Sequence, residues 1–188
     1  MQVKPNPLID SAVLVSIFRR ADGILRIVLV RRSGHGVHGG QIGFPGGKRD
    51  PADRSLLETA LRETHEEIGL ARDRVKVIEE LPAVETLTTA YRISPFLAQI
   101  DPPQRWDCSD EIAEVLEVAV DELAKPEAHG EDMADLPAWT GPRPLPFFTL
   151  GSHRIWGATY RILLPLLSRL LAKSVTGVPL GSGPQVER

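Results

Sequence analysis

Runs of apolar residues separated by turn signals predict several β-strands along the chain. Residues 11–18 (SAVLVSIF) and 24–30 (ILRIVLV) are rich in β-branched and apolar residues, and Asp22-Gly23 lies between them. Because Asp-Gly tolerates positive φ, this arrangement is typical of a β-hairpin. Three later runs also predict short strands: residues 75–78, 83–88 and 93–100. Residues 111–118 (EIAEVLEV) fit a strand or a helix by pattern alone.

The period of the pattern becomes helical between residues 55 and 68. Four residues that can pack share an arc of about 60° on the helical wheel: Leu57, Leu61, Thr64 and Ile68. Three carboxylates gather on a second arc of about 100°, well away from the first: Glu63, Glu66 and Glu67. Ser55 is predicted to cap the helix N-terminus, and Gly69 stands where a glycine commonly ends a helix. One face of this helix is therefore predicted to pack, while another presents three carboxylates.

The remaining segments complete the predicted domain. Residues 33–43 contain five glycines and are predicted to form a loop that lets backbone approach a ligand, although a simple connection has the same composition. Residues 125–146 hold five prolines and predict a long loop, and residues 155–171 predict a second amphipathic helix. We expect one domain over residues 1–173 and a disordered tail over residues 174–188. Strands on both sides of a glutamate-bearing helix predict an α/β fold on a mixed β-sheet.

Composition and charge narrow the classes of protein to which the chain can belong. At 188 residues, 42% hydrophobic and 25% charged, it has the composition of an ordinary soluble globular protein. A formal net charge of −3 argues against a broad nucleic-acid-binding surface. The single cysteine, Cys108, excludes an intramolecular disulfide and a cysteine-based zinc cluster. Residues 1–10 show no signal peptide and residues 162–172 are too short to span a bilayer, so we expect a cytoplasmic protein.

The gathered glutamates admit two interpretations. Like charges three or four residues apart destabilise a helix by about a few tenths of a kcal/mol per pair, and Arg62 can relieve part of that repulsion. A divalent cation would relieve more, because hard cations such as Mg²⁺ prefer carboxylate and carbonyl oxygens. By pattern alone a solvated acidic surface is the commoner outcome. The surrounding residues favour the metal site.

These surroundings resemble the Nudix hydrolases, whose signature is G-x5-E-x7-R-E-U-x-E-E-x-G-U, with U an aliphatic residue. The second half matches in register: Arg62-Glu63, Glu66-Glu67, Gly69 and Leu70. Thr64 departs from an aliphatic position, and Gly47 lies one residue farther from Arg62 than the signature asks. Asp53 is the nearest stand-in for the early glutamate, which is mainly structural in the family. The resemblance implies a Nudix-like α/β/α sandwich around a mixed β-sheet and metal-dependent hydrolysis of a nucleoside diphosphate derivative.

Further matches indicate the Nudix branch that contains the coenzyme A diphosphatases. The upstream loop carries several of its residues: Arg32-Ser33, His38, Gly40, Gln41 and Phe44-Pro45-Gly46-Gly47. Residues 50–55 (DPADRS) and 155–159 (IWGAT) are similar to the same branch. The resemblance implies cleavage of coenzyme A or acyl-coenzyme A to 3′,5′-ADP and phosphopantetheine. ADP-ribose or another nucleoside diphosphate derivative is the alternative substrate, and a nucleotide-binding regulator without catalysis is the alternative function.

One departure from the branch concerns the choice of substrate. The branch usually has a second arginine where Gly36 falls in this chain, after a one-residue gap. An arginine donates two parallel hydrogen bonds to a phosphate, and coenzyme A offers a 3′-phosphate. The missing arginine predicts activity on coenzyme A with weaker discrimination against dephospho-coenzyme A or ADP-ribose, unless Arg31 or Arg32 compensates.

The resemblance also implies roles for the charged residues of the helix. Mg²⁺ or Mn²⁺ would be held by three carboxylates and one backbone carbonyl: Glu63, Glu66, Glu67 and Gly47. Arg62 would hold the glutamates in place through charge-assisted hydrogen bonds. The candidates for the general base are Glu63 and a later carboxylate, either Glu111 or Glu114.

Residues around the glycine-rich loop are the expected substrate contacts: Arg31, Arg32, His38, Gln41, Phe44, Gly46 and Gly47. The three tryptophans, Trp106, Trp139 and Trp156, could each stack on a nucleobase, with core packing as the favoured interpretation of Trp156. The expected partner is a small nucleoside diphosphate substrate, and we expect the protein to bind neither nucleic acid nor a membrane. The oligomeric state is not predicted, and a homodimer is one alternative.

Overall fold

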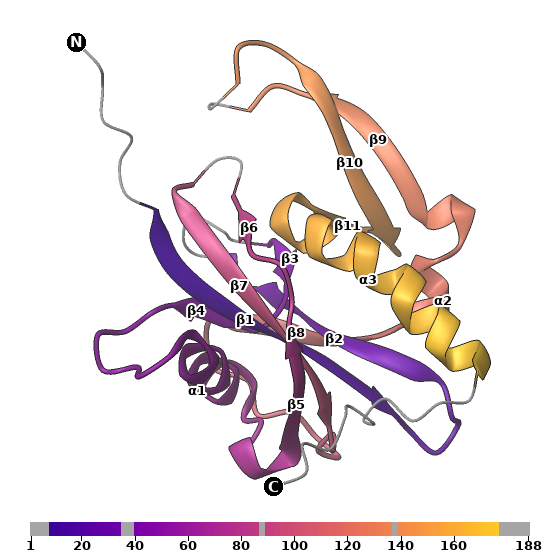
Figure 1. Ribbon diagram of the computed structural model, residues 1–188. Helices are drawn as coiled ribbons and strands as arrows, with labels where there is room; N and C mark the ends of the chain where they lie inside the picture. The colour runs from indigo at the N-terminus through magenta and orange to yellow at the C-terminus, as the bar shows by residue number, and fades with distance from the viewer. Residues whose placement is uncertain (1–7, 35–39, 87–88, 137–138, 177–188) are drawn as a thin grey trace, which may run out of the picture.

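A mixed β-sheet forms the centre of the computed structural model, which describes residues 8–34, 40–86, 89–136 and 139–176 (Figure 1). Within these residues the sheet has eight strands: β1 (Ile9–Arg19), β2 (Leu25–Arg32), β3 (Ile42–Gly43), β4 (Gly46–Lys48), β5 (Val75–Glu80), β6 (Val84–Glu85), β7 (Tyr91–Ile100) and β8 (Ile112–Ala119). The central path is β3-β2-β1-β7-β5, with β4 beside β1, β6 beside β7 and β8 beside β2. β1 is parallel to β7 and antiparallel to β2 and β4, so the sheet is mixed as predicted.

The strand predictions are confirmed for most of the sheet. β1 and β2 form the predicted hairpin, with Gly23 in the turn at a φ of 73°. The three later apolar runs become β5, β6 and β7, and residues 87–88 of the second run lie outside the described residues. The open choice for residues 111–118 is settled by pairing, because β8 forms an antiparallel ladder with β2.

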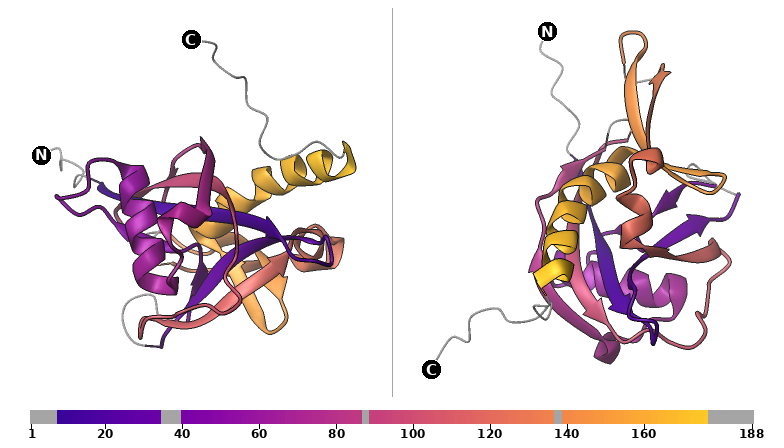
Figure 2. Two further views of the ribbon diagram at one scale, coloured as in Figure 1. Left: turned by 90° about the horizontal axis from the view of Figure 1, so that it is seen from below. Right: turned by 90° about the vertical axis from the view of Figure 1, so that its right-hand side faces the viewer.

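Two helices cover opposite faces of the sheet and complete the predicted α/β/α sandwich (Figure 2). Successive residues of a strand point to opposite faces. In β1, Leu14 therefore belongs to the apolar cluster that includes Leu61 and Ile68 of α1 (Leu56–Ile68). Val15 belongs to the other cluster, which includes Leu163 and further residues of α3 (Gly157–Thr176). Three short elements connect the strands: η1 (Arg72–Arg74), α2 (Val120–Leu123) and η2 (Pro126–Ala128).

The prediction of a long loop over residues 125–146 is wrong. The described part of this segment contains η2, β9 (His129–Ala134) and the start of β10 (Arg143–Leu150), and β10 pairs with β9 and β11 (His153–Trp156). β9 and β10 extend from the body of the molecule in Figure 1. Two prolines of β10, Pro144 and Pro146, suggested a loop. They fit a strand because β11 pairs only with residues 147–150, so the proline-bearing half of β10 has one neighbour and behaves as an edge.

The second predicted helix is present with shifted bounds. Residues 155 and 156 end β11, and α3 then runs from Gly157 to Thr176 with Pro165 inside it. The helix thus extends three residues into the predicted tail, and residues 177–188 lie outside the described part of the chain. Among the described helices, none is long and apolar enough to cross a membrane.

Candidate active site

Local capping signals set the two ends of α1, the helix that carries the glutamates. The Ser55 hydroxyl accepts a hydrogen bond from the Glu58 amide at 3.2 Å, which satisfies one of the free N–H groups of the first turn. Gly69 ends the helix at a φ of 69°, and its amide donates to the His65 carbonyl. Both predicted caps are confirmed.

The glycine turn before α1 lies in direct contact with the glutamates. A Cβ added to Gly47 would lie 2.4 Å from Glu63 Oε2, so only a glycine leaves room for this carboxylate. A Cβ added to Gly46 would lie 2.3 Å from the Ala12 carbonyl oxygen of β1. The Gly46 amide donates to Glu67 Oε2 at 2.9 Å. The two glycines therefore let one turn contact β1 on one side and two glutamates on the other.

Arg62 connects the glutamates to a buried aspartate. Its Nε and Nη2 atoms donate to the two carboxylate oxygens of Asp53, each at 2.9 Å. Its Nη1 atom lies 2.9 Å from Glu63 Oε1 and 2.9 Å from Glu66 Oε2. The hydrogen bonds from Arg62 contribute most to holding the pKa of Asp53 well below its usual value, and further hydrogen bonds add to the effect. Asp53, the nearest stand-in for the early signature glutamate, thus anchors Arg62.

Glu67 is the most buried of the three glutamates, with 5% of its side chain exposed. Its Oε1 atom lies 2.8 Å from the Arg32 guanidinium, and Arg32 also donates to the Gly46 carbonyl at 2.9 Å. Burial raises the pKa of Glu67, and the positive charge of Arg32 opposes that shift. Burial likewise raises the pKa of Glu63, against the effect of Arg62. Two arginines therefore compensate the acidic face of α1.

The potential ligand atoms on this face are oxygens, which are the ligands that a hard divalent cation prefers. Three carboxylates and the Gly47 carbonyl offer oxygen ligands. The Glu63 carboxylate occupies the space beside Gly47 that a Cβ would fill. In the described residues, no three acidic, histidine or cysteine side chains converge closely enough to hold a metal ion. The reason is that Glu63 and Glu66 are turned toward Arg62, and Glu67 toward Arg32. Coordination would require the carboxylates to exchange these arginine contacts for the cation.

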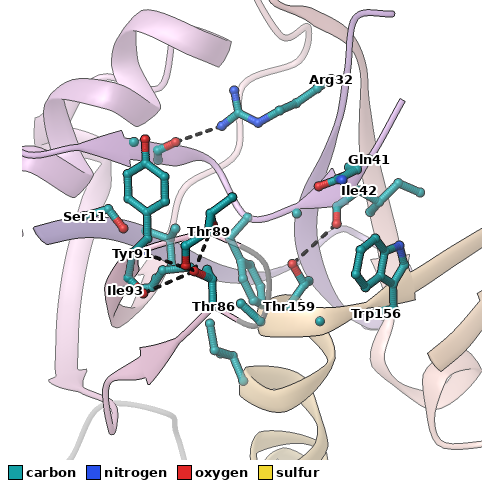
Figure 3. Close-up of a pocket in the computed structure, with 18 of the residues that line it drawn as sticks. Ser11, Arg32, Gln41, Ile42, Thr86, Thr89, Tyr91, Ile93, Trp156 and Thr159 are labelled. Carbon is teal, nitrogen blue, oxygen red and sulfur yellow. Dashed lines mark hydrogen bonds between the residues drawn. The ribbon is translucent and has the colours of Figure 1, made fainter. Parts of the chain in front are cut away.

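A cavity of about 300 Å³ opens beside the glycine turn (Figure 3). Five of the predicted substrate residues line it: Arg32, Gln41, Phe44, Gly46 and Gly47. Arg31 does not line it, and its side chain forms an ion pair of 3.3 Å with Glu114 instead. His38, like Gly36, lies outside the described residues.

The two later carboxylates proposed as general bases lie on a loop and strand tied to the site. The Ser109 amide donates to the Glu67 carbonyl at 3.0 Å, which attaches this loop to the end of α1. The Ser33 amide donates to the Glu111 carbonyl at 2.8 Å, which attaches it to the end of β2. The Glu111 residue is exposed, and the Glu114 carboxylate contacts Arg31. Among the described residues, neither carboxylate contacts the glutamates of α1.

Several cavity residues were not predicted from the sequence, because most of them lie far along the chain from the glycine-rich loop. Ser11, Lys48, Thr86, Thr89, Tyr91 and Thr159 all line the cavity. The favoured interpretation of Trp156 as a core residue is wrong, since Trp156 also lines the cavity and belongs to neither apolar cluster of the described residues. Trp106 donates from Nε1 to Glu117 at 2.9 Å, and Trp139 lies under the Arg143 guanidinium. Neither of these two tryptophans lines the cavity.

Replacing Gly47 with alanine is expected to lower kcat about 10²-fold while the protein still folds. The new Cβ would displace the Glu63 carboxylate, which ends a flexible side chain and can move. Gly46→Ala is the matched comparison and should be strongly destabilised, because its Cβ meets the backbone of Ala12 and its φ is 145°. Thermal unfolding and steady-state kinetics of both variants check this. Wild-type turnover by Gly47→Ala would contradict the placement of Glu63 in the site.

Comparisons with known proteins agree with this geometry. A family model described as NUDIX domain matches residues 8–140. The protein NudL of Citrobacter koseri, described as an uncharacterized Nudix hydrolase, is 34% identical over 155 residues, which cover 80% of this chain and 72% of NudL. NudL of Pectobacterium atrosepticum is 38% identical over 115 residues, or 60% of this chain and 58% of that protein. The crystal structure of the Nudix hydrolase RenU from M. smegmatis shares the fold, with a TM-score of 0.56 at 21% identity over 97% of this chain and 91% of RenU.

Proposed function

Because the chain belongs to the Nudix family, and is thus a hydrolase of nucleoside diphosphate derivatives, we propose that its substrate is coenzyme A or acyl-coenzyme A. The products would be 3′,5′-ADP and phosphopantetheine. The observation that carries the proposal is the meeting of the glycine turn, the glutamates of α1 and the cavity at one place. Reaction at this place requires the diphosphate to lie over Gly47, with one half of the substrate in the cavity.

Nudix enzymes generally need a divalent metal ion such as Mg²⁺ or Mn²⁺. We propose that Glu63, Glu66, Glu67 and the Gly47 carbonyl hold it, where it would supply positive charge to the diphosphate oxygens. Arg62 would keep Glu63 and Glu66 on the reacting side of α1, and Asp53 would fix Arg62. Arg32, at the cavity wall, would place its guanidinium against a phosphate oxygen.

The reaction adds water across the diphosphate. The water oxygen forms a bond to one phosphorus, and the bond from that phosphorus to the bridging oxygen breaks. The electron pair stays on the bridging oxygen, which leaves with the second phosphate. A carboxylate takes the proton from the water, and Glu63, Glu111 and Glu114 remain the candidates.

The choice of coenzyme A is supported by the way two separated stretches meet. Residues 41–47 and 155–159 both resemble the coenzyme A diphosphatases, and both contribute lining residues to the cavity. Thr159 Oγ1 donates to the Ile42 carbonyl at 3.4 Å, which joins the stretches directly (Figure 3). ADP-ribose is the alternative, because it offers the same diphosphate without the 3′-phosphate or the pantetheine arm.

A comparison of kcat/KM across substrates tests the proposal. The panel is coenzyme A, dephospho-coenzyme A, ADP-ribose, NADH, diadenosine polyphosphates and nucleoside triphosphates, with Mg²⁺ and with products identified by mass. Coenzyme A is expected to be the best substrate, and dephospho-coenzyme A a weaker one by a modest factor because Gly36 replaces an arginine. A higher kcat/KM for ADP-ribose than for coenzyme A would contradict the proposed substrate.

Replacing the general base is expected to lower kcat about 10²- to 10⁴-fold with little change in metal affinity. Glu111→Gln and Glu114→Gln are the two variants, because both residues belong to the segment that is attached to α1 and β2. Mn²⁺ affinity and kcat are measured side by side. If both variants keep most of the wild-type activity, neither residue is the general base, and Glu63 is the remaining candidate.

A further inference from the structure

We propose that Trp156 is a substrate-contacting residue whose ring stacks on the nucleobase, so that the cavity beside Gly46-Gly47 holds the nucleoside half of the substrate. The inference deepens the proposed function and rests on its claim that a nucleoside diphosphate derivative is cleaved at the glutamate face of α1. It assigns one half of the substrate to the cavity and leaves the other half outside it.

The packing of β11 leaves the Trp156 ring available for a ligand. Ile155 is fully buried in the apolar cluster of α3, and the next residue of a strand points to the opposite side. Trp156 accordingly lines the cavity, is half-buried and belongs to neither apolar cluster of the described residues. Its indole N–H has no hydrogen-bond partner among those residues, whereas a tryptophan that is committed to the interior usually has one.

The other walls of the cavity suit a flat, polar ring. Figure 3 shows Gln41 near Trp156, with Tyr91 on the opposite side of the cavity. A glutamine amide can both donate to and accept from the edge of an adenine. Base–aromatic stacking needs a π face, which every nucleobase has. The pantetheine arm is an extended chain of amides without such a face, so Trp156 would gain no stacking from it.

The charged end of the cavity gives the direction in which the substrate lies. Arg32 is at the end near Glu67 and the glycine turn, where the diphosphate must be for reaction. Trp156 lies away from Arg32 in Figure 3, on the far side of Gln41. A nucleotide with its phosphate at Arg32 would therefore direct its base toward Trp156.

Tryptophan fluorescence and equilibrium binding test the inference without turnover. Four probes are titrated into the full chain: AMP, 3′,5′-ADP, phosphopantetheine and ribose 5-phosphate. AMP and 3′,5′-ADP should quench the fluorescence, and ribose 5-phosphate, which has no base, should bind much more weakly. Trp156→Leu should abolish the quenching and raise Kd for AMP about 10- to 100-fold. Trp156→Phe should restore most of the affinity because it keeps an aromatic face.

Trp139→Leu is the matched control, since it removes a tryptophan that does not line the cavity. It should bind AMP as the wild type does and keep the quenching. The inference is overturned if Trp156→Leu binds AMP like the wild type, or if phosphopantetheine gives the Trp156-dependent signal. The comparison of AMP with ribose 5-phosphate does not depend on which derivative is cleaved. If coenzyme A failed as a substrate, the conclusion that Trp156 stacks on the nucleobase would therefore be unaffected. Likewise, a failure of Trp156 to bind the base would leave coenzyme A as the proposed substrate.

Discussion

Replacing Glu66 with glutamine is expected to lower kcat about 10²- to 10⁴-fold and to leave the fold intact. A metal ion supplies several kcal/mol of charge stabilisation to the transition state, and each 1.36 kcal/mol corresponds to about tenfold in rate. The Glu66 side chain is 56% exposed and forms an ion pair with Arg62, so its neutral isostere should scarcely change the free energy of unfolding. Steady-state kinetics with Mg²⁺ and a thermal unfolding curve measure the two effects separately.

Glu67→Gln should lose comparable activity and also some stability. Glu67 is buried and holds both the Gly46 amide and Arg32, so the variant weakens a charged hydrogen-bond pair by about 1–3 kcal/mol. Glu58→Gln is the matched control, because Glu58 lies on the same helix but pairs with Arg54 at 3.0 Å, away from the site. It should retain wild-type kcat. Near-wild-type turnover by both Glu66→Gln and Glu67→Gln would contradict the role given to the acidic face.

Asp53→Asn is expected to lower the free energy of unfolding by about 2–4 kcal/mol at pH 7. The variant removes a carboxylate that is 4% exposed and accepts two hydrogen bonds from Arg62. Because Arg62 would lose its anchor, Glu63 and Glu66 should no longer be held in their orientation. The value of kcat should therefore fall as well. Asp22→Asn is the control: Asp22 also pairs with an arginine, Arg26, but its side chain is 45% exposed, so the change should be much smaller.

The same variant gives a pH dependence with a defined sign. Arg62 lowers the pKa of Asp53 in the folded protein below its value in the unfolded chain. The stabilisation is therefore fully present above the ordinary aspartate pKa of about 3.9 and is lost as pH falls through the lower folded value. Urea unfolding should show a constant difference between wild type and Asp53→Asn from pH 7 to 5, and a shrinking one below about pH 4. A difference that grows on acidification would show that Asp53 is not an ionised partner of Arg62.

The elements predicted best are those whose signals are local. Ser55, the apolar arc and Gly69 lie within one short segment, and α1 begins and ends where they predict. The hairpin turn at Gly23 is equally local. The acidic face of α1 was also readable, because helical spacing alone brings three carboxylates together. Arg62 was expected to hold these carboxylates, but the sequence did not show that Arg32, from β2, holds Glu67 as well.

The features that sequence reasoning missed depend on pairing between distant segments. β9 and β10 have little hydrophobic alternation, and β10 contains two prolines, so nothing local distinguishes them from a loop. Trp156 follows the apolar Ile155 and resembles a core residue until the register of β11 places it on the other side. The cavity itself joins β1, β3, β7 and the start of α3, and no single stretch of sequence contains it.

Hydrolysis in ¹⁸O-labelled water is the most direct test of the central claim, which is metal-dependent addition of water across a diphosphate at the acidic face of α1. The purified chain is incubated with Mg²⁺ and coenzyme A, and the products are analysed by mass. The expected products are 3′,5′-ADP and phosphopantetheine, one of which carries a single ¹⁸O atom, with product formation abolished by excess chelator and reduced about 10²- to 10⁴-fold in Glu66→Gln. Undiminished hydrolysis in excess chelator, or wild-type hydrolysis by Glu66→Gln, would contradict it.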